Sequence, residues 1–294
     1  MSLNRLSNLL KHAKSNGYAI GYFEAWDMYS FEAVLEAAEE ENSPVILGFG
    51  ATMMNQQWLG RFGVAPFGAY GKQIADHAKV PCAFIFNEAL DINHIAQAVG
   101  TGFNTVMLDS CHLPFVENVE ITRQVIKLAN PYGIEVQAEL GQLPDFGDDS
   151  KGALTDPDEA VKFVQQTGVD FLAVSIGNVH LQTQGSFEVD LERLEKILAK
   201  VDVPLVIHGG SGFPDEVVST VIQKGVSMFH YGTKMKKAFL DATMYHIEEL
   251  KGQSLDYQAL VGSRKESDTL LPAKNGIKEV VKKQMRLFGS SQKA

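Results

Sequence analysis

The sequence lacks a long apolar run and is poor in cysteine. It contains no stretch of about 18 consecutive apolar residues, which argues against a membrane span. Its two cysteines, Cys82 and Cys111, lie inside or beside apolar segments. Two isolated cysteines do not form a disulfide framework, so we expect a reducing, cytoplasmic location.

Basic residues are also few. The chain has 26 Lys and Arg against 36 Asp and Glu, a net charge of −10, and only the KMKK segment at 234–237 clusters positive charge. This pattern argues against a nucleic-acid partner, which would need a broad basic face. It does not exclude a small anionic substrate, because such a ligand needs only local donors.

Apolar residues are plentiful and regularly arranged. They make up 45% of the 294 residues. Short runs rich in Val, Ile, Leu and Phe alternate with amphipathic segments, as expected for strands covered on both faces by helices. The predicted strands are 18–24, 44–50, 81–88, 105–109, 135–141, 171–177, 204–210 and 228–233, and the clearest helices are 30–42, 114–130 and 156–168.

Eight strand–helix units predict a parallel α/β sheet, and a repeat of about 250 residues fits a closed (β/α)8 TIM barrel. An open, doubly wound sheet is the alternative, but no G-x-G-x-x-G follows the first strand. We expect one domain over residues 1–294 with extra terminal helices. These are an N-terminal helical lid, built on leucines at helical spacing, and a helical tail from about Leu240. Residues 144–159 are predicted to form a loop over the active site or at a subunit contact.

Polar residues follow the predicted strands at their carboxyl ends, where TIM barrels carry their active sites. Scattered surface residues would not all fall at these positions. The residues are Glu24, Asn87, Glu88, Asp109, Glu139, His180, His208, His230 and Thr233.

Three of these residues predict a metal site. His180 and His208 follow neighbouring strands, and Glu88 is placed to provide a third ligand. Two imidazoles and one carboxylate form a common zinc set. The alternative is that each histidine only bonds a backbone group. Asp109 and Glu139 have three open roles: second-cation ligands or supports, acid–base groups, or partners in salt bridges around the rim.

The HGGSG segment at 208–212 predicts a phosphate site. Glycine-rich turns expose backbone N–H groups, and the loops after strands seven and eight are the usual phosphate site of TIM barrels. The alternative is a tight turn without a ligand. The predicted phosphate-binding residues are Gly209, Gly210, Ser211, Thr233 and Lys234.

Five blocks of sequence resemble the class II, metal-dependent ketose-bisphosphate aldolases over nearly the whole chain. They lie at 32–47, 106–122, 136–143, 172–180 and 204–216. The resemblance implies a divalent ion, most simply Zn²⁺, that polarises the carbonyl of a phosphorylated ketose. It implies metal ligation by His180 and His208, support of a second cation by Asp109 and Glu139, and phosphate binding by Ser211 and its glycines. It also implies a homodimer or homotetramer.

The chain departs from this family at one central point. The family has Asp-His-Gly, an acid–base group followed by a metal ligand, where this chain has Asn87-Glu88-Ala89. A glutamate can still bind zinc. An amide cannot carry a proton near neutral pH and offers only hydrogen bonds.

Other departures fall on the same rim. His230 stands where the family has asparagine, Leu181 follows His180 where it has glycine, and FEAWD and GFGA end the first two strands where it has FNVNN and a serine before glycine. Random drift would spread such changes over the surface. The clustering therefore predicts a changed substrate or changed chemistry.

The sequence thus predicts a metal-dependent aldolase-like lyase acting on a phosphorylated ketose other than fructose 1,6-bisphosphate. The candidate catalytic residues are Asn87, Glu88, Glu24 and His230, with Asp91 or a metal-bound water as further candidates for acid–base work. Two alternatives are a metal-assisted isomerase or epimerase and a catalytically silent sugar-phosphate-binding homologue. Metal analysis and proton exchange of dihydroxyacetone phosphate would separate these hypotheses.

Overall fold

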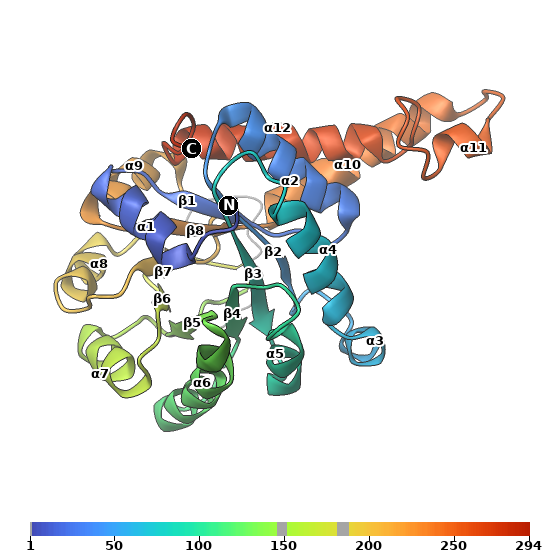
Figure 1. The fold of residues 1–294 in the computed structure, drawn as a ribbon. Helices are drawn as coiled ribbons and strands as arrows, with labels where there is room; N and C mark the ends of the chain where they lie inside the picture. The colour runs from blue at the N-terminus through green and yellow to red at the C-terminus, as the bar shows by residue number, and fades with distance from the viewer. Residues whose placement is uncertain (1, 146–151, 181–187) are drawn as a thin grey trace.

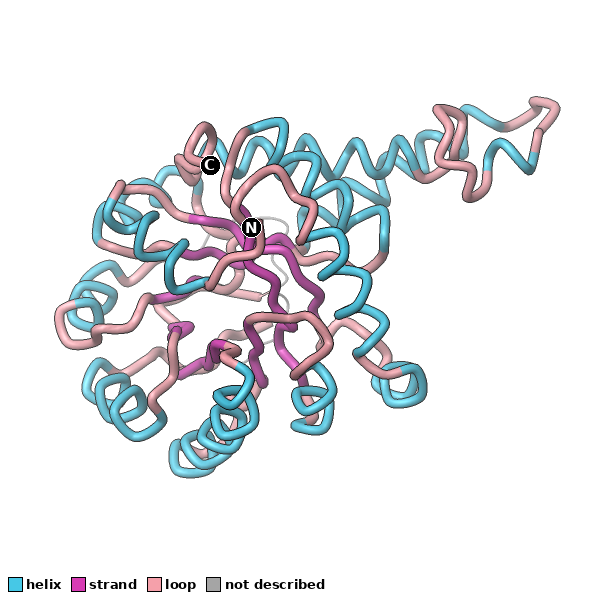
Figure 2. Tube along the Cα trace, viewed as in Figure 1, coloured by secondary structure: helices cyan, strands magenta, loops and turns pink. Residues whose placement is uncertain are grey.

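A computed structural model describes residues 2–145, 152–180 and 188–294. Within these residues, eight parallel strands close into a barrel in the order β1 to β8, with β8 paired to β1. Figures 1 and 2 show the strands at the centre and the helices around them. The predicted (β/α)8 barrel is confirmed, and the open sheet is excluded.

The strands lie within or close to the predicted runs, and several are shorter at their carboxyl ends. At these ends the backbone stops pairing with the neighbouring strands and continues into the loops that hold the candidate site residues. The bounds are β1 Ile20–Phe23, β2 Val45–Gly50, β3 Cys82–Ala89, β4 Thr105–Leu108, β5 Glu135–Leu140, β6 Phe171–Val174, β7 Leu205–Ile207 and β8 Met228–Tyr231.

The described helices surround the barrel and extend beyond it. Their bounds are α1 Leu6–Ser15, α2 Met28–Glu41, α3 Gln56–Phe62, α4 Ala65–Ala75, α5 Ile92–Ala98, α6 Phe115–Ala129, η1 Asn130–Tyr132, α7 Pro157–Thr167, α8 Leu191–Leu198, α9 Asp215–Lys224, α10 Thr233–Leu250, α11 Tyr257–Leu260 and α12 Leu271–Leu287. None of these described helices has the combination of length and apolar character needed to cross a membrane.

Local sequence signals set the helix ends. The Asp156 side chain accepts hydrogen bonds from the backbone N–H groups of Asp158 and Glu159, and Pro157 occupies the first position of α7. Gly168 ends α7 with φ of 72°, a left-handed conformation that favours glycine. At α2, Asp27 and Ser30 form a reciprocal capping box.

Helix α1 closes the end of the barrel opposite the site. Leu6 and Leu10 are fully buried and belong to one apolar cluster with Ile20, Ile46 and Met228. These three residues lie at or near the first residues of their strands. The N-terminal helix is therefore a plug at the amino end of the strands, and the prediction of a lid is corrected in this sense.

The C-terminal region begins earlier than predicted. Helix α10 starts at Thr233, directly after β8, so Leu240 lies inside it. Helix α10 extends away from the barrel, α11 lies near the far end of this extension, and α12 returns toward the barrel (Figure 1). Helix α12 packs against both α10 and α2.

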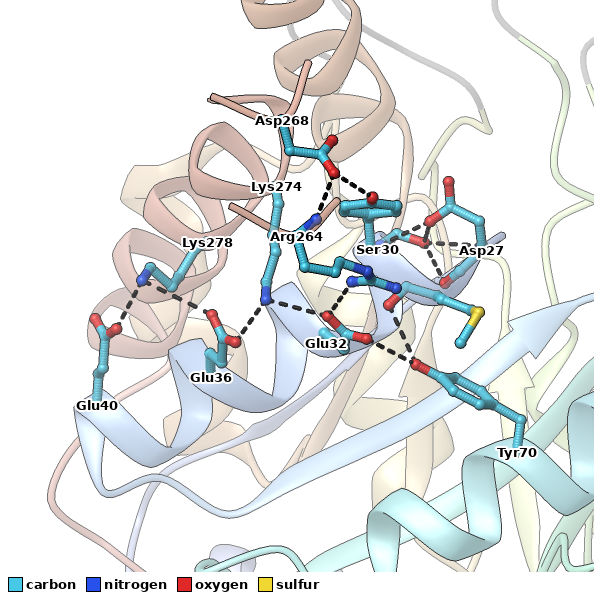
Figure 3. A network of polar contacts seen from close by, with 12 residues as sticks. Asp27, Ser30, Glu32, Glu36, Glu40, Tyr70, Arg264, Asp268, Lys274 and Lys278 are labelled. Carbon is cyan, nitrogen blue, oxygen red and sulfur yellow. Dashed lines mark hydrogen bonds and ion pairs between the residues drawn. The ribbon is translucent and has the colours of Figure 1, made fainter. Parts of the chain in front are cut away.

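A row of ion pairs joins α12 to α2 (Figure 3). Lys274 Nζ lies 3.1 Å from Glu32 Oε2 and 2.6 Å from Glu36 Oε1, and its side chain is only 9% exposed. Lys278 Nζ continues the row with Glu40 Oε1 at 2.8 Å. A network of several partly buried pairs holds its geometry better than an isolated surface pair. It fastens the returning helix to the barrel.

Candidate active site

An irregularity in β3 brings Asn87 and Glu88 together into one cavity. Successive residues of a regular strand point to opposite faces, so neighbours do not normally share a cavity. The pairing of β3 with β4 shifts register between Phe86 and Ala89. Glu88 adopts φ of 51°, a left-handed conformation that is uncommon for a residue with a side chain. Both side chains line the cavity as a result.

Glu88, His180 and His208 converge in this cavity from β3, the segment after β6 and the end of β7. One ligand atom from each lies within 4.8 Å of the others. His208 is buried, whereas the side chains of Glu88 and His180 are 14% and 30% exposed. The structure therefore brings the three predicted metal ligands together, with one side left accessible.

The surroundings of His208 fit a metal ligand. Its Nδ1 lies 2.9 Å from Glu139 Oε2 and 3.4 Å from Glu88 Oε1. Among the described residues it has no partner in hydrogen-bonding geometry. Its Nε2 lies 2.9 Å from the side-chain amide nitrogen of Gln137, and the amide oxygen has no hydrogen-bond partner among the described residues. If the amide presents its oxygen there, it accepts the Nε2 proton and leaves the Nδ1 lone pair for a cation.

The charges around the ligands favour a cation. Burial raises the pKa of Asp109, and the Glu139 and Glu88 carboxylates raise it further. Burial disfavours the charged forms of Glu139 and His208, but their mutual attraction prevails: the pKa of Glu139 is lowered and that of His208 is raised. Clustered carboxylates of this kind are stabilised by a divalent ion. Asp109 lines the cavity and Glu139 contacts His208 beside it, and their role as second-cation ligands or supports stays a prediction.

Three supporting residues escaped the sequence analysis. Thr52 donates from Oγ1 to Glu88 Oε2 at 2.9 Å. Asp145 Oδ1 lies 3.7 Å from His180 Nδ1, which places one end of the predicted 144–159 loop at the cavity. Gln137 is fully buried beside His208. Strand periodicity is a signal for Gln137, because it lies two residues before Glu139 on the same face of β5.

His230 is buried beside His208. The two rings stack with centroids 4.0 Å apart, and Tyr22 contacts His230 edge-on at 4.7 Å. Burial lowers the pKa of His230 well below its ordinary value, and the nearby His208 and His180 lower it further. His230 is therefore a neutral, weakly basic imidazole that lines the cavity and packs against His208 and Tyr22, and its catalytic role stays a prediction.

The predicted phosphate residues are partly assembled at the ends of β7 and β8. Gly209, Ser211, Gly232 and Thr233 line the cavity, whereas Gly210 and Lys234 are not among its lining residues. Ser211 Oγ accepts a hydrogen bond from the Gly232 N–H at 3.2 Å. Helix α10 begins at Thr233, so its N-terminus adds the partial positive charge that attracts anions.

The Gly209–Gly212 turn is tight. Gly209 has φ of 68°, and a Cβ there would lie 2.3 Å from the Val179 carbonyl oxygen. The N–H of Gly210 donates to His230 O, and that of Gly212 donates to Gly209 O. These two donors are thus used within the protein, which narrows the backbone contribution that this turn can make to a phosphate site.

Glu24 lines the same cavity and is paired with a lysine. Its Oε1 lies 2.6 Å from Lys236 Nζ, and Lys236 reaches the cavity from the first turns of α10. Burial raises the pKa of Glu24, while Lys236 opposes the shift. The predicted phosphate-binding lysine of the KMKK segment is Lys234, but the lysine of this segment that lines the cavity is Lys236.

One further candidate, Asp91, falls outside the assembled site. Asp91 is exposed and caps α5, accepting from the Asn93 N–H at 2.8 Å. It does not line the cavity, so the structure does not support it as an acid–base group. Leu181 lies outside the described residues.

Asn87 lines the cavity. It is 1% exposed, and its Oδ1 has no hydrogen-bond partner within the described parts of the chain.

Comparison with known proteins agrees with this architecture. The model of the class-II fructose-bisphosphate aldolase family matches residues 4–293. A probable fructose-bisphosphate aldolase of Bacillus subtilis is 35% identical over 301 residues, covering 100% of both chains. A 6-phospho-5-dehydro-2-deoxy-D-gluconate aldolase of Halalkalibacterium halodurans is 31% identical, covering 100% of this chain and 99% of the relative. The crystal structure of the Escherichia coli K12 YdjI aldolase superposes with a TM-score of 0.79 at 29% identity, covering 99% of each chain.

The fold and site define a TIM-barrel lyase of the aldolase type. The chain belongs to the class-II fructose-bisphosphate aldolase family. Its relatives are named for different sugar phosphates, so membership of the family leaves the substrate open.

Proposed function

We propose that this protein is a metal-dependent aldolase that cleaves or forms a C–C bond in a phosphorylated ketose other than fructose 1,6-bisphosphate. The observation that carries this proposal is the buried Asn87 beside an assembled Glu88–His180–His208 cluster. The ligand set supports metal chemistry. The amide at position 87 is incompatible with the family's usual acid–base step.

Glu88, His180 and His208 would hold the ion, and Zn²⁺ suits two imidazoles and a carboxylate. When bound, it would polarise the ketose carbonyl and favour loss of a neighbouring proton. Thr52 orients the Glu88 carboxylate, and Gln137 fixes the ring of His208. Ser211, Thr233 and the start of α10 would hold the substrate phosphate beside the ion.

We assign the acid–base role to Glu24. A general base works best when its pKa lies near the working pH, and burial moves the pKa of Glu24 in that direction. Its carboxylate lies in the cavity with Lys236 as a fixed partner. Asn87, which faces the same space, would donate to or accept from a substrate hydroxyl without exchanging a proton.

The proposal is tested with the zinc-loaded protein and two assays. The first follows exchange of the dihydroxyacetone phosphate C–H proton with solvent by NMR. The second follows condensation of that ketone with a panel of hydroxyaldehydes. We expect exchange and condensation with some aldehydes. Exchange without condensation would favour the isomerase or epimerase alternative, and absence of both would favour the silent sugar-phosphate-binding homologue.

We further propose that the protein is a homodimer or homotetramer. The resemblance to the family supports this, and the outer part of α10 together with α11 exposes several large apolar side chains. They are Leu240, Met244, Tyr245, Ile247, Tyr257 and Val261. Sedimentation equilibrium tests the proposal, and a monomer at micromolar concentration would contradict it.

A further inference from the structure

Glu24 occupies space that exists only because residue 50 is glycine. A Cβ built on Gly50 would lie 2.4 Å from Glu24 Oε2 and 2.6 Å from its Cδ. Real Cβ atoms do not approach other atoms so closely, so any side chain at position 50 would displace the carboxylate. The end of β2 is therefore open specifically to receive the Glu24 side chain from the end of β1.

Lys236 pairs with this carboxylate, and among the described residues no other acid lies within 4.0 Å of its Nζ. Its Nζ lies 2.6 Å from Glu24 Oε1 and 5.8 Å from the centroid of the Trp26 ring. Within the described residues, Lys236 is the one lysine or arginine that lines the cavity. The acids that line it are Glu24, Glu88, Asp109 and Asp145.

These side chains divide the rim into two parts. Ser211, Gly232 and Thr233, the anion-binding part, lie after β7 and β8. In the second part, Glu24 follows β1 and borders Gly232 of the first part, Gly50 ends β2, and Asn87 lies on β3. A ketose phosphate held on the first part, with its carbonyl toward Glu88 and His208, extends its remaining carbons toward the second. There it meets a carboxylate and an amide, and the nearby ammonium is already neutralised.

We infer that Glu24 selects a substrate whose far end carries hydroxyl groups and no second phosphate, so that the aldehyde fragment is an unphosphorylated hydroxyaldehyde. This inference rests on the proposed function and narrows its substrate class. A carboxylate accepts hydrogen bonds from hydroxyl groups. By pairing with Lys236, Glu24 also occupies the one ammonium among the described cavity residues that could bind a second phosphate, which carries a charge of about −1.5 to −2 at neutral pH. Lys236 offsets part of the carboxylate's charge, and the remaining repulsion of a phosphate is screened less inside a cavity than at the surface.

Calorimetric binding to the zinc-loaded protein tests the inference. The probes are matched pairs that differ only in the second phosphate: fructose 1-phosphate against fructose 1,6-bisphosphate, and the corresponding tagatose pair. Dihydroxyacetone phosphate reports on the first phosphate site. We expect at least one monophosphate to bind at least ten-fold more tightly than its bisphosphate, with a smaller ratio at high salt.

Two variants locate the cause of this preference. Glu24→Gln keeps the shape but removes the charge, and we expect it to reduce the preference for the monophosphate by about ten-fold. Gly50→Ala should reduce it in the same direction by displacing the carboxylate. Gly60→Ala is the matched control, because a Cβ at Gly60 meets no atom within 4 Å. We expect it to leave the ratio unchanged.

The outcomes separate the two proposals. If dihydroxyacetone phosphate binds but each ketose pair binds equally, or neither member binds, the role of Glu24 is overturned and the aldolase proposal stands. A preference for the bisphosphate, or a monophosphate preference that survives Glu24→Gln, overturns it as well. If dihydroxyacetone phosphate does not bind either, the proposed function fails together with the inference.

Discussion

Oε1 of Glu88 lies 3.4 Å from Nδ1 of His208, although the two residues belong to β3 and to the end of β7. The contact joins a carboxylate to a buried ring nitrogen that lacks a hydrogen-bond partner among the described residues. A cation shared by both groups, with His180 as the third ligand, explains this arrangement, and the first prediction follows from it.

We predict that His180→Ala and His208→Ala lose bound zinc, and that Glu88→His keeps or tightens it by replacing a carboxylate with a neutral imidazole. Metal content after dialysis, measured by atomic emission, provides the check. His77→Ala is the control, because His77 is exposed and bonds the Gln73 carbonyl. Stoichiometric zinc in both His180→Ala and His208→Ala would contradict the assignment of these residues as metal ligands.

The second prediction concerns the backbone at Glu88. A left-handed conformation costs a residue with a side chain about 1–2 kcal/mol, and glycine avoids most of that cost at some loss of chain entropy. Without metal, we expect Glu88→Gly to be more stable than Glu88→Ala by about 1 kcal/mol, while both lose the rise in Tm on adding zinc. Thermal unfolding with and without zinc gives the comparison. Equal stability of the two variants would show that the backbone is not strained.

The third prediction concerns Gln137, which fixes the ring of His208. Removal of a group that orients a metal ligand typically weakens metal binding about 10–100-fold. We expect this loss for Gln137→Leu, with Gln137→Glu weakening zinc binding less because a carboxylate accepts the Nε2 proton. Zinc competition against a fluorescent chelator measures both. If Gln137→Leu binds zinc with unchanged affinity, Gln137 does not orient His208 and serves only to fill space beside it.

Much of this site was predictable from the sequence, for a physical reason. Parallel strands of a barrel end on one rim, so Glu88, His180 and His208 could be grouped without knowing any distance. Side-chain direction was less predictable. The irregularity at Glu88 depends on the pairing of β3 with β4, and the choice of Lys236 over Lys234 depends on the phase of α10 relative to β8. Neither is encoded in a local pattern of a single sequence.

The fourth prediction concerns pH and the attachment of α12. Hydrogen bonds from Arg286 hold the pKa of Glu41 below its ordinary value of 4.5. The pair therefore stabilises the fold above that pH, and the contribution disappears as the pH falls through the lowered pKa. We expect Glu41→Gln to lower Tm at pH 6 and to differ progressively less from the native protein as the pH falls below 4.5. Glu192→Gln, which breaks an exposed pair with Lys196, should change Tm little at either pH. A constant effect of Glu41→Gln at all pH values would contradict this account.

The last prediction concerns Asn87. Cleavage of fructose 1,6-bisphosphate needs a side chain that takes a proton from the substrate hydroxyl, a contribution of about 10²–10⁴-fold in rate, or roughly 3–5 kcal/mol of barrier. An amide cannot provide it, and Glu24 lies where a second phosphate would be repelled. We therefore expect very weak cleavage of fructose and tagatose bisphosphates by the native protein at saturating zinc.

Asn87→Asp alone should not restore full turnover, because Glu24, Gly50 and His230 still shape the cavity. Combining Asn87→Asp with Glu24→Gln should raise bisphosphate cleavage above either single variant. Ordinary turnover by the native protein would mean that another group already acts as the base for this substrate, and the interpretation of Asn87 as a functional change would be wrong.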